Sequence, residues 1–589
     1  LSTGLVAGGG LVAWSATAPG EGDVVRLLDP GYVATGLCGR GTRHAAAFGP
    51  LRLAMVATAD AAEATAAPPP LWEGLGDLSY KVTTGSEQAQ RYFDQGFRLT
   101  WAFNHAEALR AFREAERQDP QCAMCYWGEA FVLGPNINAP MDDAAKAPAL
   151  AAVRKAQQLA PQAGEREQAL IAALATRYSD APNADRKSLD RAYADAMAEV
   201  QTRFPDDQNI AVLFADSVMN TSPWDYWEAD HSTPKGRVGV AVAAIEQVLA
   251  KNPENPAAIH LYIHLTEAST TPERAEPYAD RLGRLMPGAG HIVHMPSHTY
   301  YRIGRYLDAL HANIAAAAVD EAYLAKVDVG SVHANGIYPY GYYPHNVHFE
   351  LASAQMAGDG KTSVAASDKL AGLIPDAVAA KVGLVQPVKA APYFAYAQFA
   401  EWDKILALPD PGQGFPYLQG MWHYARGAAL VARGELDGAK TEAAQIAALH
   451  QNGDFRLLQA WQVPAQDILQ LARHVLEARI AQADGRLDQA IEEFRVAVQI
   501  QDSIPYMEPP YWYYPVRQSL GAALLAAGRN EEAQAVLQRA LLDAPNNGWA
   551  LFGLMQAETA QGDAAGAEAT RKLFERAWAG GAPPKLASL

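Results

Sequence analysis

Residues 521–545 read GAALLAAGRNEEAQAVLQRALLDAP. Gly528, Asn530 and Ala533 of this stretch are followed 34 residues later by Gly562, Ala564 and Ala567, so the glycine and one alanine recur. A fixed period of this length indicates helix pairs that are stable only when each pair stacks on its neighbours. We therefore expect a helical solenoid rather than a mixed α/β enzyme fold.

The same register returns elsewhere in the chain. Its small and large packing positions reappear as Gly96, Leu99, Ala108, Phe112, Ala115 and Pro120, and again as Ala478, Gly485, Leu487, Ala490, Phe494 and Ala497. In these offsets the chain resembles the tetratricopeptide repeat family. The resemblance implies an all-α solenoid of helical hairpins from about residue 75 onward, with a concave groove lined by the first helix of each hairpin.

The predicted solenoid divides into sections. Residues 1–75 are rich in Ala, Gly and Pro, and we expect a leader, a tether or a poorly structured N-terminal arm. Tetratricopeptide-like helices should follow at 76–235, histidine-rich central repeats at 236–370, and further repeats at 371–589. A long insertion with Gly and Pro at about 320–343 is expected to cover the functional site, because such insertions commonly form lids.

A short stretch within the N-terminal arm bears on the compartment. Arg52 precedes an apolar run from Leu53 to Thr58 and an Ala-rich tract. This order weakly resembles an export signal. We expect an exported protein, periplasmic or secreted, with the cytoplasm as the alternative.

Composition narrows the classes of partner. The formal net charge is −17 and Lys and Arg form no block, so neither nucleic acid nor an anionic membrane surface is an expected partner. No apolar run reaches the roughly 20 residues that span a bilayer. Three cysteines are too few for a disulfide framework or a structural zinc site, and Cys122 and Cys125 are expected to serve packing or a local disulfide.

Histidines crowd the centre of the chain. Nine of the 15 fall between His260 and His348. Two HxxxH pairs lie 34 residues apart, so both pairs face the groove from adjacent repeats, and a weaker alignment adds the next repeat. We expect a metal site made by His260, His264, His291, His294, His298, His345 and His348.

Two further side chains continue these helix faces. Glu267 and Tyr301 lie one turn beyond the HxxxH pairs, where either can act as ligand, base or hydrogen-bond partner of a ligand. A donor set rich in imidazole suits copper, iron or zinc rather than magnesium or calcium. Six histidines from three helices would resemble the three-plus-three ligand count of dicopper oxygen-handling sites. We favour copper or iron, in one or two ions, whereas ligation by Glu267 would favour iron or zinc.

Three motifs carry a further resemblance. They are HLYIHLTEAS at 260–269, GHIVHMPSHTY at 290–300 and YPHNVHF at 343–349. In these motifs, residues 80 to 575 look like a family of large bacterial tetratricopeptide-domain proteins. That resemblance supports the architecture and the histidine cluster and implies no particular reaction.

The first function hypothesis is a copper or iron oxidoreductase that acts on a small, aromatic substrate in the groove. The alternatives are a zinc-dependent hydrolase, a scaffold that binds a peptide or protein in the groove, and a metal-storage or metal-delivery protein. The central groove positions carry His, Glu and Tyr rather than the Lys, Arg and Asn of a carboxylate clamp, which favours the metal hypotheses. The sequence contains no phosphate-binding Gly-rich loop, GxSxG or HExxH motif.

Overall fold

The computed structural model describes residues 68–327, 337–586 and 589. Within them the regular secondary structure is helical, and the only β pairing is two isolated bridges, Asn136 with Ala139 and Trp227 with Pro234. The expected all-α solenoid is confirmed. Most of the expected N-terminal arm, with its export-like stretch, lies outside the described residues.

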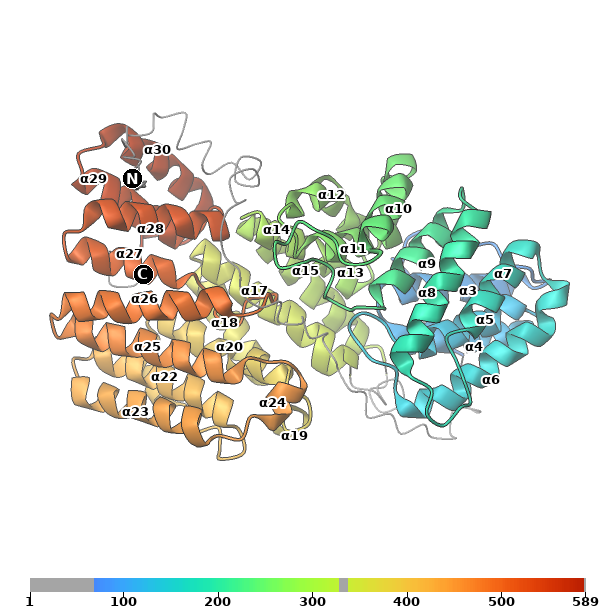
Figure 1. Ribbon diagram of the computed structural model, residues 1–589, viewed down its shortest axis with the longest axis horizontal. Helices are drawn as coiled ribbons and strands as arrows, with labels where there is room; N and C mark the ends of the chain where they lie inside the picture. The colour runs from blue at the N-terminus through green and yellow to red at the C-terminus, as the bar shows by residue number, and fades with distance from the viewer. Residues whose placement is uncertain (1–67, 328–336, 587–588) are drawn as a thin grey trace, which may run out of the picture.

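The helices succeed one another as hairpins along the chain (Figure 1). The N-terminal section holds α3 (Glu87–Trp101), α4 (His105–Gln118), α5 (Ala123–Leu133), α6 (Lys146–Leu159), α7 (Glu165–Ala175), α8 (Arg186–Arg203) and α9 (Gln208–Met219), with short 3-10 turns at Asp143–Ala145 and Ala160–Gln162. The central section holds α10 (Val238–Lys251), α11 (Pro256–Thr266), a 3-10 turn at Pro272–Ala275, α12 (Glu276–Leu285), α13 (Gly290–His294), α14 (Pro296–Arg302), α15 (Tyr306–Leu324), the π-helical turn η5 (Tyr338–Tyr342), α17 (Tyr343–Ala357) and α18 (Gly360–Ala371). The C-terminal section holds α19 (Asp376–Ala379), α20 (Val385–Gln398), α21 (Trp402–Ala407), α22 (Pro416–Ala432), α23 (Leu436–Asn452), α24 (Arg456–Ala460), α25 (Ala465–Ala483), α26 (Leu487–Ser503), α27 (Val516–Ala526), α28 (Asn530–Asp543), α29 (Gly548–Ala560) and α30 (Ala564–Ala577).

Close approach between helices explains the small residues of the repeat. Phe112 of α4 is fully buried between Gly96 of α3 and Gly128 of α5. A Cβ atom at Gly96 would lie 2.8 Å from the Phe112 ring, and one at Gly128 would lie 2.4 Å from it. Only glycine leaves room for the ring at both positions, so the small and large offsets of the sequence pattern are packing constraints.

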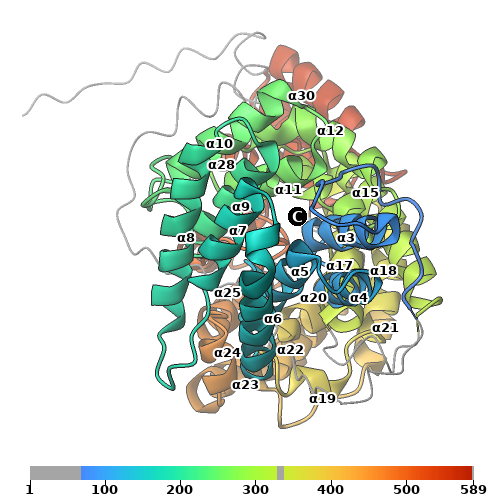
Figure 2. The same cartoon turned by 90° about the vertical axis from the view of Figure 1, so that its right-hand side faces the viewer.

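Two large apolar cores run through the solenoid. One extends from Leu75 to Tyr342 and the other from Tyr301 to Phe574. Figure 1 shows the N-terminal helices at one end, the C-terminal helices at the other and the central helices between them. In Figure 2, along the long axis, α3 to α9 stand in front of the central helices. The histidine motifs therefore lie where the two cores meet.

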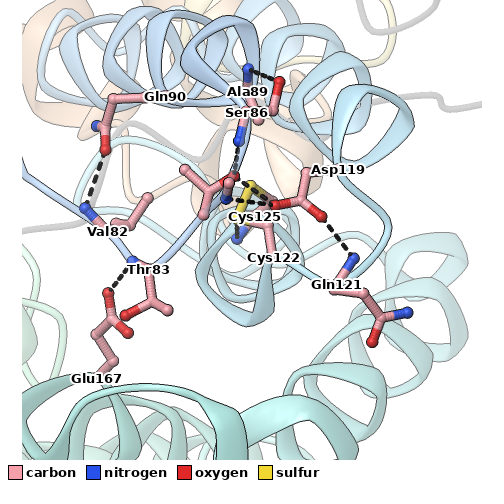
Figure 3. Close-up of a disulfide and its surroundings, with 12 residues drawn as sticks. Val82, Thr83, Ser86, Ala89, Gln90, Asp119, Gln121, Cys122, Cys125 and Glu167 are labelled. Carbon is pink, nitrogen blue, oxygen red and sulfur yellow. Dashed lines mark hydrogen bonds between the residues drawn. A yellow bond between two sulfur atoms is a disulfide. The ribbon is translucent and has the colours of Figure 1, made fainter.

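The segment before α3 connects the first hairpins through hydrogen bonds (Figure 3). The Thr83 amide donates to Glu167 Oε1 at 2.6 Å, and the Thr84 hydroxyl donates to Asp119 in the turn before α5. Residues 68–75, at the end of the predicted arm, pack against the helical body, since Leu75 is buried in the first core.

The turn before α5 also holds the two neighbouring cysteines. Cys122 is the N-cap residue of α5 and forms a disulfide with Cys125, and both side chains are fully buried. The pair thus forms a local disulfide, one of the two roles expected for it.

No helix in the described part of the chain is both long and apolar enough to cross a membrane.

Candidate metal centre

The first histidine pair, His260 and His264, lies on α11, whose first turn is well defined. The Asn255 side chain caps this helix by accepting from the Ala258 amide, and Pro256 occupies its first turn. His260 and His264 then lie one turn apart on the same helix face, and both are buried. Every residue of α11 is buried, so these imidazoles face other helices rather than solvent.

The next three histidines lie on two consecutive short helices, α13 and α14, and the second of these begins at Pro296. His291 and His294 lie on α13, and His298 lies on α14, so the three rings are separated by about one turn each. A Cβ atom at Gly290 would lie 1.8 Å from Asp320 Oδ1, so glycine is required beside His291.

The last histidine of the cluster, His345, lies on α17, which directly follows the π-helical turn η5. Six of the seven expected ligands thereby form two groups. The first triad is His260, His264 and His291, and the second triad is His294, His298 and His345. Within each triad, one ring nitrogen of every member lies within 4.8 Å of the others. The triads adjoin, because the ring centroids of His264 and His298 are 5.7 Å apart.

Hydrogen bonds orient the rings of the first triad. His260 Nδ1 lies 2.6 Å from the Trp101 carbonyl oxygen and must donate to it, since a carbonyl can only accept. His264 Nδ1 donates to Glu267 Oε1 at 2.8 Å, and its buried Nε2 has no hydrogen-bond partner among the described residues. In their neutral forms both rings therefore carry a bare Nε2 lone pair.

Two rings of the second triad, those of His294 and His298, follow the same rule. His294 Nδ1 lies 2.6 Å from Asn313 Oδ1, and the Asn313 amide is fixed because its Nδ2 donates to the Ala309 carbonyl. His298 Nδ1 donates to Glu267 Oε2 at 2.5 Å. One buried carboxylate, Glu267, thus receives an Nδ1 hydrogen from each triad.

These orientations turn Nε2 atoms toward one another. His294 Nε2 and His298 Nε2 are 2.8 Å apart, and His260 Nε2 and His291 Nε2 are 3.1 Å apart. Two neutral rings that both donate through Nδ1 would present opposed lone pairs at 2.8 Å, which is repulsive. A shared proton or a metal ion between His294 and His298 removes that repulsion.

Burial sets the charge of the rings. Burial first, and neighbouring imidazoles second, hold the pKa of His260, His291, His294 and His345 well below its usual value. These rings are therefore neutral at pH 7, the form that binds metals.

The exception is the histidine beside the buried carboxylate. Burial opposes a positive charge on His298, but the adjacent Glu267 carboxylate raises the pKa of His298 above its ordinary value. Burial likewise opposes a negative charge on Glu267, yet His298 and His264 lower the pKa of Glu267 to about 2. Glu267 is therefore an ionised hydrogen-bond acceptor at neutral pH.

A phenylalanine backs each triad. Phe103 packs against all three rings of the first triad, with its centroid 4.5 Å from that of His260. Phe349 does the same for the second triad, with its centroid 4.8 Å from that of His298. Phe103 adopts a φ of 53°, a region costly for a non-glycine residue, so packing holds it there.

A pocket opens onto both triads. Four of the residues that line this pocket are histidines from the two triads, namely His264, His291, His298 and His345. The other lining residues are Asn138, Trp224, Gly341, Tyr342, Tyr506, Met507 and Glu508. Gly341 and Tyr342 belong to the insertion at 320–343, so its described part contributes to the lining of this pocket, whereas 328–336 lie outside the described residues.

Two predicted site residues lie apart from the triads. His348 is buried and pairs through Nε2 with the Tyr513 hydroxyl, and it joins neither triad. Tyr301 packs against Tyr306 and Phe349 and is not among the residues that line the histidine pocket. Glu267 lies at the centre, but on the Nδ1 side of the rings.

Sequence reasoning missed Glu508. Its side chain is 4% exposed, its Oε2 lies 3.6 Å from His298 Nδ1, and it accepts from the Tyr506 hydroxyl. Burial, and next the charge of Glu267, raise the pKa of Glu508 to about 8. Glu508 lies in the loop between α26 and α27, 210 residues after His298, and no repeat offset marks it.

Comparison with known proteins agrees with the architecture. A tetratricopeptide repeat family model matches residues 524–572. The fold is a tetratricopeptide-type helical solenoid. The matched residues lie outside the three histidine motifs, whose resemblance to a bacterial family stays a prediction. A search of curated proteins finds no match.

Solved structures with similar helical arrangements have low sequence identity. A human IFIT1 dimer with m7Gppp-AAAA is 12% identical, with 84% of this chain and 90% of that chain covered and a TM-score of 0.28. Yeast Tom70 is 12% identical, with coverages of 83% and 91% and a TM-score of 0.26. The tetratricopeptide domain of P58(IPK) is 13% identical, with coverages of 80% and 98% and a TM-score of 0.20. These likenesses concern the fold alone.

Proposed function

We propose that this protein is a copper-dependent oxidoreductase that holds one ion in each histidine triad and acts on a small aromatic substrate. The observation that carries the proposal is the convergence of bare Nε2 atoms from four rings, those of His260, His264, His294 and His298, whose Nδ1 hydrogens are bonded elsewhere. Metal-binding histidines characteristically use this arrangement, because the Nδ1 partner fixes both the tautomer and the ring orientation.

The spacing of the nitrogens supports metal binding. Two nitrogens bound to one tetrahedral ion at about 2.0 Å lie roughly 3.3 Å apart. The His260–His291 separation of 3.1 Å and the His294–His298 separation of 2.8 Å are close to this value. A small outward movement of the rings would accommodate an ion in either triad.

The donor set favours copper over the other metals. Each triad consists of three imidazoles, and the two nearby carboxylates, Glu267 and Glu508, approach His298 on its Nδ1 side. A set of nitrogen donors suits copper, whereas iron and zinc enzymes commonly add a carboxylate ligand. Paired copper ions would supply oxygen binding and two-electron oxidation.

The remaining pocket residues have separate tasks. Trp224 and Tyr342 pack edge-on or tilted against His264 and His291, so they shield the first triad and offer aromatic surface to a substrate ring. Glu508 provides a carboxyl group at the pocket wall that can exchange a proton with a substrate hydroxyl.

Metal content tests the proposal. We would purify the untagged protein, measure its metals by elemental mass spectrometry, and load the metal-free protein with copper(I) before admitting oxygen. Two coppers per chain, together with oxygen-dependent oxidation of a phenol, are expected. His311→Ala is the matched control, because His311 is an exposed histidine on neighbouring α15.

Other results would select the other hypotheses. Zinc at two ions per chain with hydrolytic activity would replace the oxidoreductase by a hydrolase. Binding of copper without any oxidation would favour storage or delivery. A protein that binds no metal would belong to the scaffold class, with a peptide in the groove; nucleic acid is not among the partners we propose, given the net charge of −17.

We also propose that the protein is exported. A disulfide such as Cys122–Cys125 persists mainly in oxidising compartments, which supports that location. Because both cysteines are buried, free thiols are alkylated in cells lysed directly into denaturant. Resistant Cys122 and Cys125 are expected, and reactive thiols would favour the cytoplasm.

A further inference from the structure

We propose that a second hollow beside the histidine pocket binds the carboxylate group of an aromatic acid through Arg302. This inference rests on the proposed function, because it names the class of substrate that the histidine pocket would oxidise. The two hollows share a wall made of Tyr506, Met507 and Glu508. A ligand seated in the second hollow is therefore next to the histidine pocket.

The second hollow has the size and surface of a small-molecule site. It contains about 1040 Å³ of empty space, counting its opening to solvent, near the upper end of such sites. Aromatic side chains dominate its walls, among them Tyr301, Tyr306, Tyr506 and Trp512. Rings of this kind favour a flat aromatic ligand through stacked and edge-on contacts.

Arg302 is positioned between the hollow and the second triad. It lies four residues after His298 on α14, so the two side chains leave the same face of one helix. Its guanidinium lies 5.1 Å from the centroid of the Tyr506 ring, and Nη2 donates to the Ser269 carbonyl at 3.3 Å.

The cation retains capacity for a ligand. Arg302 Nε is buried and has no hydrogen-bond partner among the described residues. The nearest carboxylate oxygen, Glu508 Oε1, is 4.0 Å away, beyond hydrogen-bond distance. The Arg302 side chain is 29% exposed, so a ligand carboxylate can reach the guanidinium, whose planar form suits that geometry.

The other charges of the hollow already neutralise one another. Arg517 donates to both carboxylate oxygens of Asp502 at 2.6 Å and lies 3.4 Å from Asp543. Asp543 also accepts from Arg539 at 3.0 Å. Of the two cations among the described lining residues, Arg302 therefore lies farther from its nearest carboxylate oxygen than Arg517 does.

Size and direction then define the ligand class. A carboxylate at Arg302 directs an attached ring along Tyr506 toward Glu508 and His298. Hydroxybenzoates and hydroxyphenylacetates have this form, with the acid at one end of the ring and an oxidisable hydroxyl at the other.

Calorimetry on the metal-free protein tests the inference. The probes are 4-hydroxybenzoate and its methyl ester, which share a ring and differ in charge. We expect the acid to bind at least about tenfold more tightly than the ester, as a charged hydrogen bond implies. Arg302→Gln should remove the difference, and Arg302→Lys should keep part of it. Arg456→Gln is the control, because Arg456 is exposed and far along the chain on α24.

Equal binding of acid and ester, or binding of neither, would overturn the inference. Circular dichroism of each variant verifies that it is folded. Acid-selective binding by a protein that takes up no metal would retain this inference and reject the proposed function. A copper-loaded protein that oxidises neutral phenols without preferring the acid would do the reverse.

Discussion

His294 and His298 face each other through Nε2 atoms 2.8 Å apart, while both rings have their Nδ1 hydrogens bonded to other side chains. Because His298 is the member next to the buried carboxylate, its raised pKa makes the shared proton the state expected without metal. Metal binding at this triad must therefore displace a proton, and the predictions below use that relationship.

Replacing His298 by alanine should remove one copper and leave the other. The second triad loses a ligand, whereas His260, His264 and His291 remain. The copper content measured by elemental analysis after copper loading should fall from two ions per chain to one. Oxidation of the phenol should cease, because the proposed reaction uses paired ions. Unchanged copper content in His298→Ala would contradict the assignment of the second triad; His311→Ala is the control and should retain both ions.

Replacing Glu267 by glutamine should weaken both triads together. Glu267 accepts from His264 through one oxygen and from His298 through the other, and a glutamine amide offers a single acceptor. Loss of such a partner typically lowers metal affinity by roughly 10- to 100-fold. Competition with a copper chelator measures this affinity. Glu246→Gln is the comparison, because Glu246 is a partly exposed partner of Arg274; an effect equal to that control would argue against the orienting role.

The metal-free protein should lose stability as the pH falls below about 6.5. Below that pH the unfolded chain binds protons on His260, His291, His294 and His345, whereas the folded chain resists protonation because their pKa values are lowered. His298 contributes in the opposite direction, because its pKa is raised. The midpoint temperature of thermal unfolding of the native protein should therefore decrease as the pH is lowered below this value.

The same titration has an internal control. His294→Gln removes one of the neutral buried rings, so its midpoint should decline less steeply with falling pH. A midpoint that does not change with pH in either protein would show that these histidines are not held neutral by the fold.

Replacing Gly290 by alanine should disturb the first triad selectively. The new Cβ atom would lie 1.8 Å from Asp320 Oδ1, so the start of α13 must shift and His291 must move with it. We expect loss of the ion bound by His260, His264 and His291, measured by copper stoichiometry. Gly164→Ala is the matched control, since a Cβ atom there meets nothing within 4 Å; identical behaviour of the two variants would exclude this effect.

The site was partly predictable for a local reason. Residues four apart on a helix share a face, so His260 with His264 and His294 with His298 were paired by spacing alone. The 34-residue period placed the two pairs on neighbouring repeats. That reasoning did not extend to α17, because the insertion at 320–343 interrupts the period, and His345 rather than His348 enters the second triad.

The sequence by itself determined the helical solenoid and the faces that carry the histidines, because helix periodicity and repeat spacing are properties of short stretches. Only the tertiary structure decided which atoms of those histidines are bonded and which are bare. The Nδ1 partner Trp101 and the pocket residue Glu508 come from distant parts of the chain. Their meeting depends on how the hairpins stack around the junction of the two cores, and no local spacing in the sequence encodes that packing.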